Sequence, residues 1–144
     1  MAPQEELRRG RPATVAVASG EAGWRRRIAR AIASHPDLRP VGRAADGTGA
    51  ARLIAAKHPD VALLDIPLDG LDEIWLCEWI TAHRPEWRTR VVLLDSRPDP
   101  ASVAQAATAG AAGYIDRSMP EQRLREAVAR VARGGTTFAP AAAA

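Results

Sequence analysis

The chain has 144 residues, with 20 Lys and Arg against 17 Asp and Glu, and a single cysteine. That length suits one domain with a buried core, and a hydrophobic content of 47% excludes wholesale disorder. The lone cysteine excludes a disulfide framework and a multi-cysteine metal site, and it favours a cytoplasmic location. No uncharged apolar run reaches the roughly 18 residues of a membrane span. A net charge of +3 is weak evidence for direct nucleic-acid binding.

Short apolar runs alternate along the chain with longer amphipathic segments. The short runs predict strands over residues 14–18, 40–44, 61–65, 91–94 and 111–115. The amphipathic segments predict helices over residues 22–34, 49–57, 72–83, 100–109 and 120–133. Asp46 is the expected N-cap of the second helix, and Gly134 ends the last one. Five strand–helix repeats predict an α/β fold, with a parallel sheet covered by helices on both faces.

The two ends of the chain differ from this pattern. Residues 1–12 hold five charged side chains and no apolar stretch, so they do not form a signal peptide. We predict a flexible N-terminal extension over 1–12, a folded domain over 13–135 and a linker-like C-terminal tail over 136–144.

Polar residues follow the predicted strands directly. In a doubly wound sheet, ligands bind at the carboxyl ends of the strands, where the strand order reverses. These residues are therefore the candidate pocket. They are Ser19, Gly20, Glu21, Asp65, Asp95, Ser96 and Arg117.

Two segments resemble the receiver domain of bacterial response regulators. Pro59–Asp65 is similar to the third receiver strand, which ends in the phospho-accepting aspartate, and Ala109–Arg117 is similar to the fifth, which normally ends in a lysine. Ala44–Gly47 and Arg133–Pro140 are typical of the NarL/FixJ subfamily, whose receivers precede a LuxR-type helix-turn-helix. The resemblance covers about residues 13–140. It implies a flavodoxin-like (CheY-like) doubly wound fold with five strands in the order 2-1-3-4-5.

The family's functional residues match this sequence only in part. Asp65 stands at the phospho-acceptor position, and Tyr114 stands at that of the switch aromatic. The family's adjacent pair of magnesium-binding acidic residues is replaced by Ser19-Gly20, with Glu21 one place later. The family's Thr or Ser after the fourth strand is replaced by Asp95, with Ser96 beside it. The family's lysine after the fifth strand is replaced by Arg117.

These departures change the chemistry that we expect of the pocket. Mg²⁺ requires hard oxygen ligands, and Ser19-Gly20 supplies one neutral oxygen, so we expect magnesium binding to be lost or weak and no cofactor to be held. A phosphoryl group on Asp65 would be repelled by Asp95. We hypothesise that Arg117 bridges Asp65 and Asp95 and holds the pocket in one state without metal.

The resemblance implies an atypical receiver domain in a two-component system, acting largely without phosphorylation. It would control transcription through dimerisation and a DNA-binding output domain outside this chain. The implied partners are a second copy of the chain and a histidine kinase or other regulatory protein. The alternative is a stand-alone pseudo-receiver that binds a partner protein or a small ligand.

Three further features of the sequence concern enzyme activity, an arginine run and a pair of tryptophans. We expect no enzyme activity, because Gly-x-Ser-x-Gly is absent and the three histidines are predicted at the opposite end of the sheet from Ser19. Arg25–Arg27 and Arg30 are interpreted as a solvated helix face, with contact to DNA or an acidic partner as the alternative. Trp75 and Trp79, one helical turn apart, are interpreted as core, with a protein contact as the alternative.

Overall fold

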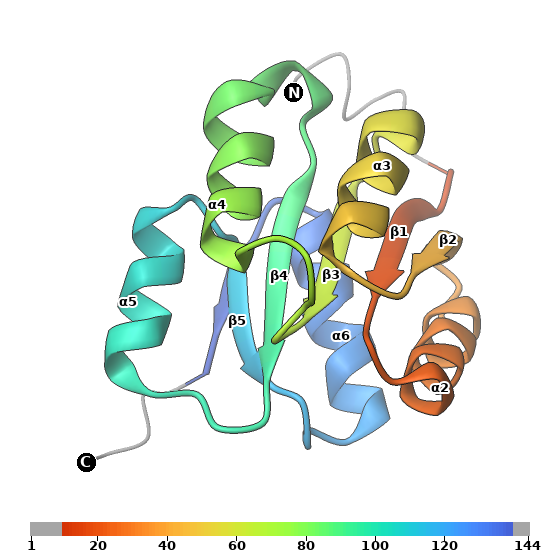
Figure 1. Cartoon of the computed structure of the whole chain (residues 1–144). Coiled ribbons are helices and arrows are strands. Elements are labelled where there is room, and N and C mark those ends of the chain that lie inside the picture. The colour runs from red at the N-terminus through yellow and green to blue at the C-terminus, as the bar shows by residue number, and fades with distance from the viewer. Residues whose placement is uncertain (1–9, 140–144) are drawn as a thin grey trace.

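The structure, a computed structural model, describes residues 10–139 and contains one parallel sheet (Figure 1). The strand order is β2-β1-β3-β4-β5-β6. The strands are β1 (Ala13–Ala18), β2 (Leu38–Ala44), β3 (Val61–Asp65), β4 (Arg90–Asp95), β5 (Gly113–Asp116) and β6 (Thr137–Phe138). The helices are α2 (Ala22–Ala33), α3 (Gly47–Lys57), α4 (Glu73–Glu78), α5 (Pro100–Thr108) and α6 (Glu121–Ala132). A π-helical turn, η1 (Trp79–His83), and a 3₁₀ turn, η2 (Pro85–Trp87), continue α4.

The sheet has a hydrophobic core on each face. Because successive strand side chains point to opposite faces, Val61 and Leu63 of β3 join one core, and Ala62 and Leu64 join the other. Helices α2 and α6 cover the first face, and α3, α4 and α5 cover the second (Figure 1). With both faces covered, the central strands read as continuous apolar runs, as the sequence predicted.

Three helices begin at aspartates that accept hydrogen bonds from the first helical turn. Asp46 Oδ1 accepts from the Gly49 amide at 2.7 Å, which confirms the predicted cap of α3. Asp72 caps α4, and Asp99 caps α5. All three lie near the carboxyl edge of the sheet and add negative charge there.

The predicted strand count of five is wrong, because the chain forms a sixth strand after α6. Gly134, with a φ of +100°, turns the chain back toward the sheet. The Thr137 amide then donates to the Ala112 carbonyl at 3.0 Å, and the Ala139 amide donates to the Tyr114 carbonyl at 2.7 Å. The first residues of the segment predicted as a linker-like tail therefore extend the sheet beyond β5.

The interpretation of Trp75 as core is wrong. Trp75 is 51% exposed, whereas Leu76 and Cys77 beside it are fully buried. Its ring stacks on that of Trp79 at 5.9 Å. Trp79 itself is half-buried and packs against the core, so the interpretation as core is confirmed for Trp79. Helix α4 therefore buries one side against the sheet and presents Trp75 to solvent.

Parts of the predicted terminal segments lie outside the described residues. These parts are 1–9 of the predicted flexible extension and 140–144 of the predicted tail. Gly10–Pro12, also placed in the extension, are described and precede β1 directly. Within residues 10–139, no helix is long and apolar enough to cross a membrane.

Candidate functional site

The residues singled out at the strand ends lie together at one edge of the sheet. Asp65 is the last residue of β3, and Asp95 is the last residue of β4. Ser19, Gly20 and Glu21 connect β1 to α2, and Arg117 directly follows β5. Because these strands are neighbours and parallel, their carboxyl ends meet there. Gly20 and Ser96 are exposed at the rim.

Asp65 forms the floor of the pocket and is only 4% exposed. Its Oδ2 accepts a hydrogen bond from the Ser19 hydroxyl at 2.7 Å and lies 3.3 Å from Nη2 of Arg117. Its Oδ1 is buried and accepts no hydrogen bond from any described residue. Burial raises the pKa of Asp65, while the bond from Ser19 and the charge of Arg117 lower it by less. The structure thus keeps a half-satisfied carboxylate in the interior.

Arg117 is bound by Glu21. Its Nη1 and Nη2 donate to the two carboxylate oxygens of Glu21 at 3.0 and 3.1 Å, a bidentate pair. The guanidinium carbon also lies 4.7 Å from the centre of the Trp24 ring. This bidentate bond lowers the pKa of Glu21 and raises that of Arg117. The cation of the pocket is therefore engaged by groups of the chain itself.

The hypothesis that Arg117 bridges Asp65 and Asp95 is half wrong. Arg117 bridges Asp65 and Glu21 instead. Two contacts explain the change: the Trp24 ring holds the guanidinium beside α2, and Asp95 already has other donors. Glu21, one place after the expected acidic pair, takes the role that the hypothesis gave to Asp95.

Asp95 is hydrogen-bonded to Tyr114 and not to Arg117. The Tyr114 hydroxyl donates to Asp95 Oδ2, and the Arg97 amide donates to Oδ1 at 3.0 Å. The Tyr114 side chain is only 2% exposed. Burial, followed by the bond to anionic Asp95, raises the pKa of Tyr114. The aromatic ring is thus fixed in an inward position by a carboxylate of the neighbouring strand.

The donor set of the pocket does not fit a resident Mg²⁺ ion. The Ser19 hydroxyl is bonded to Asp65, Gly20 has no side chain, and both oxygens of Glu21 are bonded to Arg117. Across residues 10–139, no group of three or more His, Cys, Asp or Glu side chains is placed to hold a metal. Mg²⁺ needs carboxylate oxygens that are free to coordinate, and the described pocket offers mainly the buried oxygen of Asp65.

Two residues of the site were missed by sequence reasoning. Arg25, read as part of a solvated run, is half-buried, and its Nη1 donates to the Ser19 carbonyl at 2.6 Å. Trp24 is buried in the core, and its ring also supports the guanidinium of Arg117. The available signal was their position in the first turn of the helix that follows the pocket loop.

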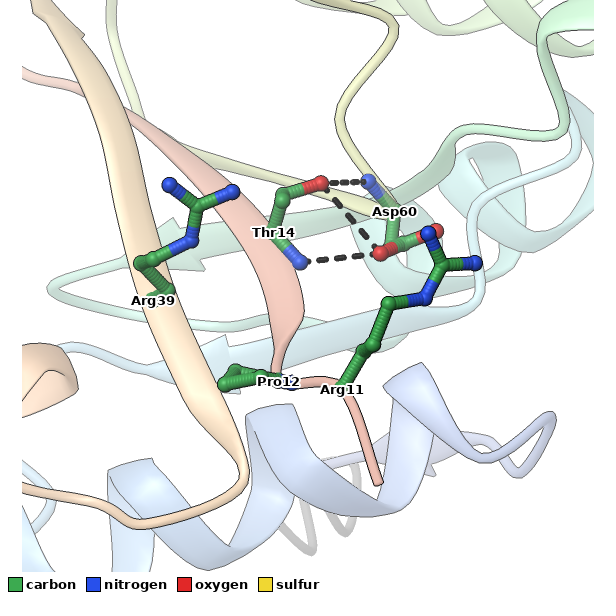
Figure 2. Close-up of a pocket in the computed structure, with 5 residues that line it drawn as sticks. All are labelled: Arg11, Pro12, Thr14, Arg39 and Asp60. Atoms are coloured by element: carbon green, nitrogen blue, oxygen red, sulfur yellow. Dashed lines mark hydrogen bonds between the residues drawn. The ribbon is translucent and has the colours of Figure 1, made fainter. Parts of the chain in front are cut away.

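A second hollow, of about 460 Å³, lies at the opposite, amino end of the sheet (Figure 2). It is lined by Arg11, Pro12, Thr14, Arg39 and Asp60. Asp60 Oδ2 accepts from the Thr14 amide at 2.8 Å and from its hydroxyl at 3.2 Å. In return, the Asp60 amide donates to the Thr14 hydroxyl at 3.0 Å. These bonds tie the start of β1 to the start of β3.

Comparisons with known proteins agree on one protein family. Residues 15–129 match the response regulator receiver domain family. A probable transcriptional regulatory protein NarL of Mycobacterium tuberculosis is 35% identical over 117 residues, which are 81% of this chain and 53% of that protein. The DNA-binding transcriptional activator DevR/DosR of the same species is 31% identical over 110 residues, which are 76% of this chain and 50% of that protein. The chain thus spans about half the length of these curated relatives.

Solved structures show the same similarity in three dimensions. The signal receiver domain of Mycobacterium tuberculosis NarL superposes with a TM-score of 0.80 at 33% identity, covering 85% of this chain and 98% of that domain. A LuxR-family two-component response regulator from Aurantimonas sp. SI85-9A1 gives a TM-score of 0.81 at 25% identity, covering 90% of this chain and 91% of that one. The doubly wound, CheY-like fold expected from the sequence is therefore confirmed.

Proposed function

Because this chain belongs to the response regulator receiver domain family, we propose that it is an atypical receiver whose signalling is largely independent of phosphorylation. Two-component receivers of the NarL type are its relatives, so a regulatory role is the starting point. The observation that carries the proposal is the bidentate bond between Arg117 and Glu21. It engages the cation that occupies the place of the family's lysine.

Charge supports this proposal. Phosphoryl transfer to a carboxylate brings two anions together, so it depends on positive charge fixed around the acceptor. Arg117 is the cation paired with Asp65, and both of its Nη nitrogens donate to Glu21. Glu21 and Asp95 already disfavour the charged form of Asp65 and would oppose added negative charge there. Without a fitting magnesium site, these repulsions are poorly offset.

Tyr114 supports a fixed state of the domain. In the family that this sequence resembles, the residue at this position is the switch aromatic. Here Asp95 accepts a hydrogen bond from its hydroxyl and holds the ring inward without any phosphoryl group. We infer that the pocket keeps the domain in one conformation at rest.

The output of the whole protein belongs to the same proposal. The relatives named above are transcriptional regulators, and this chain spans about half of their length. We therefore place this domain in a dimer that controls a DNA-binding output domain outside the 144 residues. A histidine kinase or another regulatory protein is the proposed upstream partner, and we propose no catalytic turnover for the domain itself.

Treatment with a small phosphodonor tests the proposal. Incubation with acetyl phosphate and Mg²⁺, followed by intact mass spectrometry, should leave the wild-type protein without a phosphoryl group. A restored variant, Ser19→Asp/Gly20→Asp/Arg117→Lys, should gain one, and it should lose it again when Asp65→Asn is added. Phosphorylation of the wild type at Asp65 would contradict the proposal.

The second candidate function is a stand-alone pseudo-receiver that binds a partner protein or a small ligand. A hollow of about 240 Å³ that is lined by Tyr114 and Asp95, and not by Arg117, favours the binding of a partner or ligand. The same domain can hold a fixed state and present a binding site.

A further inference from the structure

A hollow of about 240 Å³ lies beside the Asp65 pocket, on the side of α4 and α5. Its walls come from the loop after β3, the start of α4 and one side of α5, and Tyr114 of β5 lines it. Figure 1 shows α4 and α5 as neighbours on the same face of the sheet. Asp95 at the end of β4 lines it as well, so five separate segments of the chain build the hollow.

The ionisable residues that line this hollow, apart from Tyr114, are both acidic. They are Glu73 and Asp95, and no Lys, Arg or His is among the lining residues. Asp99 adds a third carboxylate next to Ser102, and its charge contributes to raising the pKa of Tyr114. The two hydrogen bonds from Ser102 lower the pKa of Asp99, so it stays ionised at neutral pH. The field in the hollow favours a cation.

Asp95 retains acceptor capacity toward the hollow. A carboxylate offers about four lone-pair positions, and the bonds from Tyr114 and Arg97 use one on each oxygen. Arg117, the cation next door, is bonded to Glu21 on the far side of Asp65. This carboxylate is therefore available to a donor from outside.

The remaining walls are apolar, and the space is small. Ile66, Pro67 and Ile74 line the hollow beside the two carboxylates. Its volume is below the roughly 300–1,000 Å³ of usual small-molecule sites, so it suits one short side chain or a small amine better than a nucleotide. Apolar contacts for a stem and acidic acceptors for its tip occur together.

We propose that this hollow binds an alkylammonium or alkylguanidinium group, with the cation between Glu73 and Asp95 and its aliphatic stem against Ile66 and Ile74. The ligand is either a free amine or a Lys or Arg side chain of a partner protein, since both present the same chemistry. Occupation adds a donor to Asp95, and Asp95 holds Tyr114, so binding is felt at β5. This inference does not depend on whether Asp65 is phosphorylated.

An NMR titration of the full chain tests the proposal with three probes of similar size: butylammonium, butylguanidinium and the uncharged butanol. The two cations should bind saturably with dissociation constants of about a millimolar, as expected for ligands of few atoms, and should shift the amides of Ile74, Gln105 and Tyr114. Butanol should bind about tenfold more weakly or not at all, because it lacks the charge.

Two charge-neutralising variants on α4 form a matched pair. Glu73→Gln should weaken butylammonium binding about tenfold, because it removes one charged hydrogen-bond acceptor. Glu78→Gln removes the same charge from the same helix, outside the hollow, and should leave binding unchanged. An unchanged amide spectrum without ligand shows that both variants are folded.

A capped lysine derivative identifies the source of the ligand. Binding as tight as that of butylammonium points to a side chain of a partner protein, and exclusion of the capped compound points to a free amine. Three results would overturn the proposal: no saturable binding of either cation, equal binding of butanol, or equal weakening by Glu73→Gln and Glu78→Gln.

Discussion

The two aspartates that flank β3 are held in opposite ways. Asp60, just before the strand, exchanges three hydrogen bonds with Thr14, which join the starts of β1 and β3 (Figure 2). Asp65, at the other end, is buried with one oxygen bonded by Ser19 and the other without a hydrogen bond from the described residues. Both pairs link β1 to β3 across 46 positions of sequence.

The difference separates a carboxylate with closed hydrogen bonds from one that is left partly unpaired among the described residues. A buried carboxylate that lacks a partner on one oxygen costs folding free energy, and such groups are retained in native proteins at sites with a role. Closed reciprocal hydrogen bonds, as between Asp60 and Thr14, stabilise the fold instead. The amino end of the sheet is therefore stabilised by closed hydrogen bonds, and the carboxyl end holds the pocket.

Removal of the Arg117 guanidinium should have the largest effect on stability. Arg117→Gln leaves Asp65 and Glu21 without their cation and removes the contact with Trp24. We expect a loss of about 2 kcal/mol in the free energy of unfolding at pH 7, less than for a fully buried pair because Arg117 is 20% exposed. Urea unfolding measures it.

The control is the exposed pair between Arg27 and Glu121. Arg27→Gln should cost about 0.5 kcal/mol or less, because solvent screens such a pair. Equal losses in the two variants would mean that the Arg117 pairs contribute no more than a surface contact.

Removal of the Thr14 hydroxyl tests how far the hydrogen bonds at the amino end of the sheet stabilise the fold. Thr14→Val keeps the shape of the side chain but removes the acceptor of the Asp60 amide and one donor to its carboxylate. We expect a loss of about 1–2 kcal/mol in the free energy of unfolding, measured by urea unfolding. A loss below about 0.5 kcal/mol would show that these hydrogen bonds do not stabilise the amino end of the sheet, and the contrast between the two ends would weaken.

Neutralising Asp65 should stabilise the protein, in contrast to the two preceding changes. Burial raises its pKa in the folded protein above the unfolded value, so the folded state loses stability as the pH rises through that raised pKa. Asp65→Asn carries no charge and escapes this loss. At pH 7, the free energy of unfolding of the variant should therefore exceed that of the wild type by on the order of 1 kcal/mol. This difference should disappear as the pH falls to about 4.

Thermal unfolding across that pH range measures the gap. Asp60→Asn is the matched variant at the other end of the strand, and it should not stabilise the protein at any pH. If Asp65→Asn destabilised the protein at pH 7, the carboxylate would be a net stabilising group, and the proposed difference between the strand ends would be wrong.

The sequence predicted those parts of the fold that depend on local patterns. The apolar run of β3 and the Asp46 cap follow from chain-local physics, and both are confirmed. The strand Thr137–Phe138 is two residues long and too short to show a periodic pattern. It forms because β5 offers an open edge, which is a property of the assembled sheet.

The choice of partner by Arg117 also depends on the assembled structure. Three carboxylates, at positions 21, 65 and 95, were chemically suitable. The choice was made by Trp24 on one side and Tyr114 on the other, through contacts between segments far apart in the chain. The hollow between α4 and α5 was missed for the same reason, because five segments of the chain build it.

We propose that the Asp65 pocket does not respond to Mg²⁺ or to a phosphoryl group. An amide NMR titration with Mg²⁺, followed by Mg²⁺ with beryllofluoride as a phosphoryl mimic, tests it most directly. Ser19→Asp/Gly20→Asp/Arg117→Lys is the positive control, since a Cβ added at Gly20 meets only the Ala45 carbonyl, at 3.8 Å. We predict no saturable shifts at Asp65, Asp95 and Tyr114 in the wild type and clear shifts in the control. Saturable shifts of these amides in the wild type would contradict the account.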